Sequence, residues 1–193
     1  MLDTHARQYI QPVVQYSAQR LLKLGLTATH VTCVSLVVGV TAGILVFMGY
    51  FFMALLLLWT SGFLDVVDGT MARLTKSTPF GTVLDVTFDR LVEISIILAL
   101  AYQFPTATWA LLLLSVAIIF SMTVFLTVGA MTDNKGMKSF YYQAGLVERT
   151  EGFILFSLML LFTTYLTAIT LLFSAAVVFT GCQRLWEAKK LLG

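Results

Sequence analysis

Four aspartates are concentrated in one short stretch of a sequence that is otherwise strongly apolar. They are Asp65, Asp68, Asp85 and Asp89, and long apolar segments flank the stretch on both sides. On a helix, residues three or four positions apart share a face, so Asp65 pairs with Asp68 and Asp85 pairs with Asp89. Charged side chains near a bilayer are costly and mark functional sites. The spacing therefore predicts two carboxylate pairs that serve one site.

The chemistry of this site follows from its donor atoms. If residues 74–82 join two antiparallel helices, the carboxylate pairs face each other, and they repel unless protons or cations neutralise them. Ligands of oxygen alone suit Mg²⁺, Mn²⁺ or Ca²⁺, and the sequence has no cluster of His and Cys for zinc. Two divalent ions held by four aspartates would form a clamp for phosphoryl chemistry.

Small residues and one arginine are interleaved with the aspartates. Gly69 and Ala72 lie close to the helical face of Asp65 and Asp68, and Gly81 precedes Asp85 by one turn. Their short side chains leave room for a bulky ligand against the helix backbones. Arg73 adds a rigid donor fork that suits phosphate.

These residues together resemble the signature of the CDP-alcohol phosphotransferases. The matching pattern is Asp65-x-x-Asp68-Gly69-x-x-Ala72-Arg73, then seven residues, then Gly81-x-x-x-Asp85-x-x-x-Asp89. Members of this family displace CMP from a CDP-linked donor, usually CDP-diacylglycerol, with the hydroxyl of a second alcohol. The resemblance implies a phospholipid-synthesising membrane enzyme that uses Mg²⁺ or Mn²⁺ in a two-metal site, and it implies a homodimer.

The resemblance also implies a role for each motif residue. Asp65, Asp68 and Asp85 would hold the first metal ion, and Asp89 would help to hold a second. Asp89 would also be the catalytic base that deprotonates the acceptor hydroxyl. The cytidine diphosphate pocket would be lined by Asp68, Gly69, Ala72, Arg73 and Gly81.

One segment departs from the family pattern. Many relatives begin the first span with Thr-Pro-Asn-x-Leu/Val-Thr, where residues 27–32 of this chain read Thr-Ala-Thr-His-Val-Thr. The Pro and the Asn are replaced, and Thr29 is the candidate substitute for the nucleotide contact of that Asn.

The acceptor alcohol has to be read outside the signature. Glu148-Arg149-Thr150-Glu151 resembles a segment of relatives that use a phosphorylated polyol such as inositol phosphate. Such an acceptor needs basic groups, and the candidates are Arg149, Lys135, Lys138 and Arg184. Glycerol phosphate fits the same interpretation. Serine or another non-phosphorylated acceptor, or a soluble CDP-alcohol donor with diacylglycerol as acceptor, remain alternatives.

The elements that position these residues are predicted to be membrane helices. Apolar residues make up 59% of the 193 residues and charged residues only 11%, against about 25% charged in a typical soluble domain. The sequence predicts an all-α polytopic membrane protein, one domain over residues 1–193, with an interfacial amphipathic helix at 4–24 and six transmembrane helices within 29–186. The expected spans are 29–48, 51–72, 83–103, 107–131, 152–166 and 168–186.

The basic residues orient this layout. With six spans, all twelve Lys and Arg residues fall on one side of the membrane, which the positive-inside rule makes cytoplasmic. We expect both termini and the active site to be cytoplasmic, in a prokaryotic cytoplasmic membrane, with no cleavable signal peptide. The partners expected are CDP-diacylglycerol, a small polar alcohol and membrane lipids, with no nucleic acid.

Further features bear on packing and on rival functions. The GxxxG at Gly39–Gly43 predicts helix packing, and Cys33 and Cys182 are predicted to be packing residues rather than a disulfide. Intramembrane aspartates also build cation and proton transporters, but the charges fall on one side and no inverted repeat is evident. A non-catalytic lipid-binding relative is disfavoured because all four aspartates are present.

Overall fold

The protein is all-helical, as predicted, throughout the part of the chain that the structure describes. The computed structural model describes residues 2–131 and 145–192. The α-helices in these ranges are α1 (Leu2–Lys23), α2 (Ala28–Phe47), α3 (Phe51–Leu74), α4 (Pro79–Gln103), α5 (Thr108–Met131), α6 (Arg149–Leu161) and α7 (Leu166–Leu192). Short 3-10 turns at Pro105–Ala107 and Thr163–Tyr165 precede α5 and α7. The predicted N-terminal helix is confirmed as α1.

The described residues contain four candidate membrane spans, not the six expected. Among the described residues, the segments long and apolar enough to cross a membrane are Ala28–Phe47, Phe51–Leu74, Pro105–Met131 and Thr163–Leu192. The expected span at 83–103 lies in α4, which is long enough but carries Asp85, Asp89, Arg90 and Glu93. The expected span at 152–166 is interrupted, because α6 ends at Leu161 after 13 residues, fewer than the roughly 17 that a span needs.

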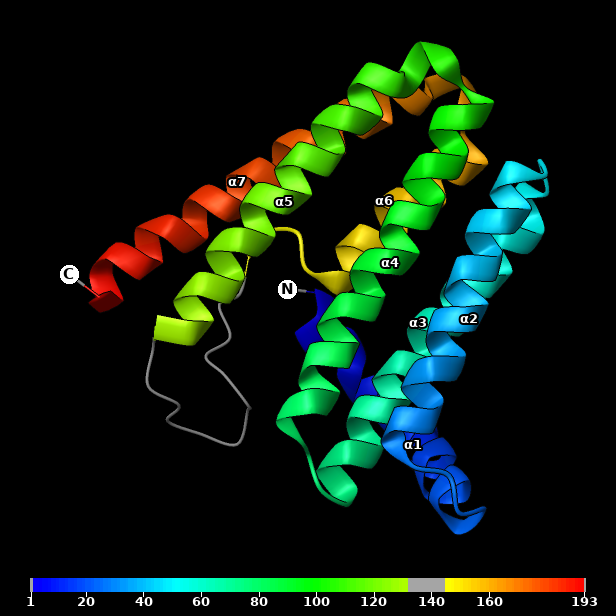
Figure 1. Cartoon of the computed structure of the whole chain (residues 1–193), viewed down its shortest axis with the longest axis vertical. Coiled ribbons are helices and arrows are strands. Elements are labelled where there is room, and N and C mark those ends of the chain that lie inside the picture. The colour runs from blue at the N-terminus through cyan, green and yellow to red at the C-terminus, as the bar shows by residue number, and fades with distance from the viewer. Residues whose placement is uncertain (1, 132–144, 193) are drawn as a thin grey trace. The chain divides into compact units, whose positions relative to one another are not determined.

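The chain forms two compact units, the first of which covers Leu2–Gln103. Within it, α2 packs along both α3 and α4, and α1 packs against α3 (Figure 1). The helices are brought together by tight turns: Gly25 and Gly49 have positive φ values of 81° and 84°, a conformation that glycine adopts without steric cost. Each glycine follows the end of a helix. The N–H of the residue after it donates a hydrogen bond to a carbonyl in the last turn of that helix.

Apolar side chains hold α1 against the part of α3 that carries the aspartates. Val14 and Ala18 of α1 form a buried cluster with Val31 of α2 and with Val67 and Met71 of α3. Val67 is fully buried and lies between Asp65 and Asp68 in the sequence. The helix on which the first carboxylate pair lies is therefore anchored by packing against α1.

The second unit begins at Phe104 and contains α5, α6 and α7. There α5 packs along α7, and Phe156 of α6 meets Phe173 of α7 edge to face, with ring centroids 5.2 Å apart. The residues before α6 are tied to α7, since the N–H of Val147 donates to Thr180 Oγ1 at 3.0 Å.

The two packing predictions have different outcomes. The GxxxG of α2 does lie in a helix contact, because Gly39 and Gly43 face side chains of α4 at close range. Cys33 and Cys182 are free thiols, but both are exposed. The prediction that they form no disulfide is confirmed, but the prediction that they are packing residues is wrong, since both side chains are exposed.

Candidate metal centre

The first carboxylate pair lies on the buried face of α3. Asp65 is 7% exposed and Asp68 is 3% exposed, whereas Val66 between them is 39% exposed. The helical period places residues three apart on one side of α3 and turns Val66 outward, while Val67 is buried in the contact with α1. Burial of two ionisable carboxylates in an apolar helix is costly unless their charge is neutralised.

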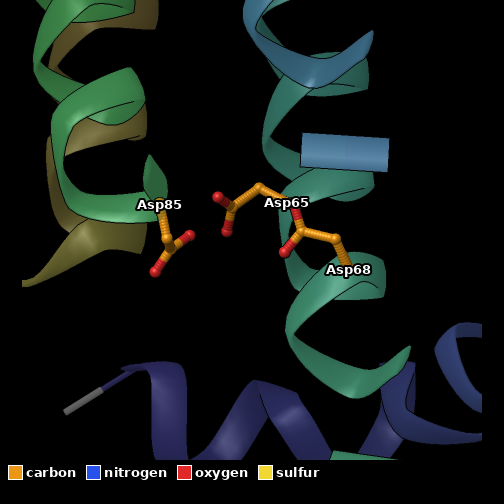
Figure 2. A group of neighbouring side chains, drawn as sticks. All are labelled: Asp65, Asp68 and Asp85. Carbon is orange, nitrogen blue, oxygen red and sulfur yellow. The ribbon is translucent and has the colours of Figure 1, made fainter. Parts of the chain in front are cut away.

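The third carboxylate comes from α4 and completes a close group. Asp85, which is half-buried, and the two aspartates of α3 each offer one oxygen, and these three oxygens lie within 4.8 Å of one another. Figure 2 shows the carboxylates of Asp65 and Asp68 pointing from α3 toward that of Asp85 on α4. We call Asp65, Asp68 and Asp85 the carboxylate group.

The carboxylate group fits a hard divalent cation. Oxygen ligands lie about 2.0–2.6 Å from Mg²⁺ or Ca²⁺, so two ligands of one ion are separated by at most about twice that distance. The oxygens of the carboxylate group are within this limit. Three like charges this close repel strongly, and a bound cation would convert that repulsion into attraction.

Asp89 lies outside the carboxylate group. It follows Asp85 by one turn of α4 and is half-buried, but it is not among the residues whose oxygens lie within 4.8 Å of one another. The structure thus brings together three of the four aspartates that the sequence singled out. That Asp89 binds a second ion or acts as the base stays a prediction.

Gly69 and Arg73 are brought into contact at the end of α3. A Cβ atom on Gly69 would lie 3.5 Å from Arg73 Nη1, so the guanidinium folds back over the glycine. Arg73 Nη2 donates a hydrogen bond to Thr70 Oγ1 at 2.8 Å. Thr70 is buried, and its own hydroxyl donates to the carbonyl of Val66 at 3.0 Å. The arginine is exposed but is held by a fixed partner.

Gly81 belongs to the capped start of α4. Its N–H donates to Thr78 Oγ1 at 3.1 Å, and a Cβ at Gly81 would lie 3.0 Å from that same oxygen. Pro79 begins the helix, where a proline loses no helical hydrogen bond. Ala72 is half-buried on α3, and Thr29 is exposed in the first turn of α2.

The candidate acceptor residues have different environments. Arg184 of α7 is 7% exposed; its Nη1 donates to Ser121 Oγ at 3.2 Å and its guanidinium lies 4.8 Å from the Phe125 ring centroid. Arg149 is the first residue of α6 and is half-buried. Lys135 and Lys138 lie outside the described residues.

Three hydroxyl side chains that the sequence did not single out support these residues. They are Thr70 beside Arg73, Thr78 beside Gly81 and Ser121 beside Arg184. The first two had a local signal, since Thr70 is three residues before Arg73 and Thr78 precedes a proline at a helix start. Ser121 had none, because its partner is 63 residues away.

Comparison with known proteins places the chain in a family. Residues 25–181 match the CDP-alcohol phosphatidyltransferase family. The inner membrane protein YnjF of Escherichia coli is 33% identical over 195 residues, which is 97% of this chain and 95% of that protein. The phosphatidylinositol phosphate synthase of Corynebacterium glutamicum is 33% identical over 162 residues, which is 80% of this chain and 71% of that one.

Solved structures agree with this assignment. The crystal structure of the phosphatidylinositol phosphate synthase of Mycobacterium tuberculosis with CDP-DAG bound has a TM-score of 0.78 and 25% identity, covering 94% of this chain and 96% of that one. A second crystal structure of that synthase, in complex with manganese and citrate, has a TM-score of 0.77 and 26% identity, covering 93% and 90%. With its carboxylate group at the spacing described above, this chain belongs to the CDP-alcohol phosphatidyltransferase family.

Proposed function

We propose that this protein transfers the phosphatidyl group of CDP-diacylglycerol to the hydroxyl of a small polar alcohol and releases CMP. The observation that carries the proposal is the carboxylate group, a buried oxygen-donor set on α3 and α4 of a family member. The relative solved with CDP-DAG bound, and the structure of it solved with manganese, support both the donor and the ion.

In this proposal the aspartates have two roles, as metal ligands and as a general base. Asp65, Asp68 and Asp85 bind Mg²⁺ or Mn²⁺, and Asp89 adds a ligand to a second ion. The bound ions neutralise the diphosphate and stabilise the CMP leaving group. Asp89 accepts the proton of the acceptor hydroxyl, a general-base role worth typically about 10²–10⁴-fold in rate.

The bonds exchanged are two oxygen–phosphorus bonds. The acceptor oxygen forms a bond to the phosphorus that carries diacylglycerol, and the bond from that phosphorus to the bridging oxygen of CMP breaks. Gly69, Ala72 and Gly81 leave space for the donor against the helix backbones, and Arg73, held by Thr70, donates hydrogen bonds to its phosphates. Thr29 takes the nucleotide contact at the start of α2.

We propose a phosphorylated polyol, inositol phosphate or glycerol phosphate, as the acceptor. Phosphatidylinositol phosphate synthases recur among the relatives, and a phosphorylated acceptor needs cationic partners. Arg149 and Arg184 are the described candidates, and Lys135 and Lys138 are candidates from sequence alone.

The setting of the enzyme completes the proposal. We place it in a prokaryotic cytoplasmic membrane as a homodimer, with both termini and the carboxylate group on the cytoplasmic side. YnjF of Escherichia coli, an inner membrane protein, supports the compartment. Residues 1–193 act as one catalytic domain with α1 in the membrane interface, in keeping with a family match that spans 25–181.

CMP release by the purified protein tests the proposal. CDP-diacylglycerol and Mn²⁺ are supplied with one acceptor at a time: inositol phosphate, glycerol phosphate, serine, inositol or water. We expect release with a phosphorylated polyol, and its loss in Asp89→Asn while donor binding is retained. Glu187→Gln, which removes a carboxylate from α7, is the matched control and keeps activity.

Two results would contradict the proposal. Undiminished CMP release by Asp89→Asn would show that Asp89 is not the general base. No release from any pairing, despite intact nucleotide and Mn²⁺ binding, would point to another donor, such as a soluble CDP-alcohol.

A further inference from the structure

A helix that carries none of the aspartates connects the two helices that do. In the first unit α2 makes extensive contacts with α3 and with α4, whereas α3 and α4, both fully described, make few contacts with each other. The oxygens of Asp65, Asp68 and Asp85 nevertheless lie within 4.8 Å of one another. Together with the short connection at residues 75–78, the contacts of α3 and α4 with α2 therefore set their separation.

The contact of α2 with α3 includes a buried pair of serines. Ser35 Oγ donates to the carbonyl of Ser61 at 2.8 Å, and Ser61 Oγ donates to the carbonyl of Ser35 at 2.8 Å. Both residues are nearly inaccessible to solvent. In an apolar setting such reciprocal hydrogen bonds fix the rotation and height of one helix against the other. Ser61 lies one turn before Asp65 on α3.

Gly39 is the point where α2 touches both partner helices at once. A Cβ atom on Gly39 would lie 2.7 Å from Ser61 Oγ on α3 and 2.8 Å from Val92 Cγ1 on α4, and it would overlap Val92 Cγ2. Separations below 3.0 Å cannot be accommodated without movement of a neighbour. The absence of a side chain at this position therefore allows the close approach of all three helices.

We propose that Gly39 and Ser61 are positioning residues for the carboxylate group, so that α2 acts as the spacer that sets the distance between Asp85 and the aspartates of α3. The inference rests on the proposed metal role of that group. Val92 lies about two turns from Asp85, so displacement of α4 at Val92 moves the carboxylate of Asp85. Ligand oxygens must lie within a few tenths of an ångström of their ideal distance, and a small displacement would weaken the site.

Mn²⁺ titration of Gly39→Ala, followed by the paramagnetic resonance signal of the free ion, tests this inference. We expect the affinity for Mn²⁺ to fall about ten- to hundredfold, the range found when residues that orient metal ligands are changed. Gly43→Ala is the matched control on the same helix. The three atoms nearest to a Cβ there would all belong to Ser95 of α4, including its backbone carbon at 2.9 Å. Because Ser95 lies farther from Asp85 along α4 than Val92 does, Gly43→Ala should lower the melting temperature but reduce Mn²⁺ affinity less than Gly39→Ala does.

A compensating substitution separates spacing from general damage. Val92→Ala removes the two methyl carbons nearest the new side chain, so the double variant Gly39→Ala/Val92→Ala should recover much of the lost affinity. An unchanged affinity in folded Gly39→Ala, or equal losses in Gly39→Ala and Gly43→Ala, would overturn the proposal. If neither glycine variant folds, Ser61→Ala decides, because it deletes the serine pair without adding volume. Its control is Ser115→Ala, which deletes a hydroxyl bonded only within α5.

A second readout needs neither metal nor substrate. Nitroxide labels on cysteines placed at Thr60 of α3 and Ile94 of α4, both exposed, report the separation of the two helices after Cys33 and Cys182 are changed to serine. We expect Gly39→Ala to lengthen or broaden the distance distribution and Gly43→Ala to change it less. An unchanged distribution in Gly39→Ala would overturn the spacer role even if CMP is released. A lengthened distribution in a protein that releases no CMP would retain the spacer role and reject only the proposed function.

Discussion

Both units of the molecule bury charge among apolar helices, and they do so in opposite ways. In the first unit, three carboxylates from α3 and α4 place oxygens within 4.8 Å of one another, an arrangement that a bound cation would stabilise. In the second, the guanidinium of Arg184 has partners within its own unit, namely the hydroxyl of Ser121 and the face of the Phe125 ring. Buried charge of the first kind indicates a binding site, and buried charge of the second kind is compatible with a purely structural role.

The two arginines beside hydroxyl groups sharpen this comparison. Arg73 is exposed and bonds to Thr70 at 2.8 Å, whereas Arg184 is buried and bonds to Ser121 at 3.2 Å. An exposed guanidinium is hydrated and can exchange part of its bound water for a ligand phosphate. A buried guanidinium has already lost that water on folding. We therefore expect the Thr70 contact to affect ligand binding and the Ser121 contact to affect stability.

The largest effect is expected for the carboxylate group. Asp68→Asn keeps the side-chain shape but removes one charged ligand, so CMP release should fall by at least about 10²-fold, since a metal ion supplies several kcal/mol of transition-state stabilisation. The melting temperature without metal should not fall, because one of three repelling charges is gone, and Mn²⁺ should no longer raise it. Activity assays and thermal unfolding with and without Mn²⁺ measure both. If Asp68→Asn were as active as Glu187→Gln, the buried carboxylates of the first unit would not be a metal-binding site.

A smaller effect, on stability and not on metal binding, is expected in the second unit. Ser121→Ala removes the hydroxyl that accepts from Arg184 and should destabilise the protein by about 1.5–3 kcal/mol, the range for hydrogen bonds to charged groups. Mn²⁺ affinity should not change. Ser115→Ala is the control on α5, since its hydroxyl bonds only to the carbonyl of Leu111. Denaturant unfolding is the measurement, and a loss of Mn²⁺ affinity in Ser121→Ala would show that the two kinds of buried charge are not independent.

The smallest effect is expected at Thr70. Thr70→Val preserves volume but removes the hydroxyl that accepts a hydrogen bond from Arg73. It should raise the KM for CDP-diacylglycerol about three- to tenfold with little change in kcat. The reason is that a hydrogen bond worth about 1 kcal/mol no longer holds the guanidinium in its orientation. Thr70→Ser should restore the KM. The control is Thr60→Val on the same helix, where the hydroxyl bonds only to the carbonyl of Leu56. A fall in kcat alone, not rescued by serine, would contradict the orienting role.

The sequence predicted the local features of this molecule well. Expected spans at 51–72 and 107–131 correspond to α3 and α5 within two residues at each end, because long apolar runs leave little choice of structure. The facing of Asp65 and Asp68 toward Asp85 followed from helical spacing and a short connection. Local chemistry was sufficient for these predictions.

Features that depend on which helices pack together were not predictable in the same way. The surface of α2 is apolar all round, so its sequence does not say which face meets α3 and which meets α4, and the double contact of Gly39 was not foreseen. The bond from Arg184 to Ser121 links residues 63 positions apart. The expected spans in α4 and α6 failed because charge and an early helix end outweighed a locally apolar composition.

The central claim is that Asp65, Asp68 and Asp85 bind a divalent cation together. Its most direct test is an anomalous difference map at the manganese absorption edge from crystals grown with Mn²⁺. We predict a peak between the three carboxylates, with an oxygen of each within about 2.5 Å of it, and no such peak in Asp68→Asn. A wild-type map with manganese elsewhere, or with none at the carboxylate group, would contradict the account.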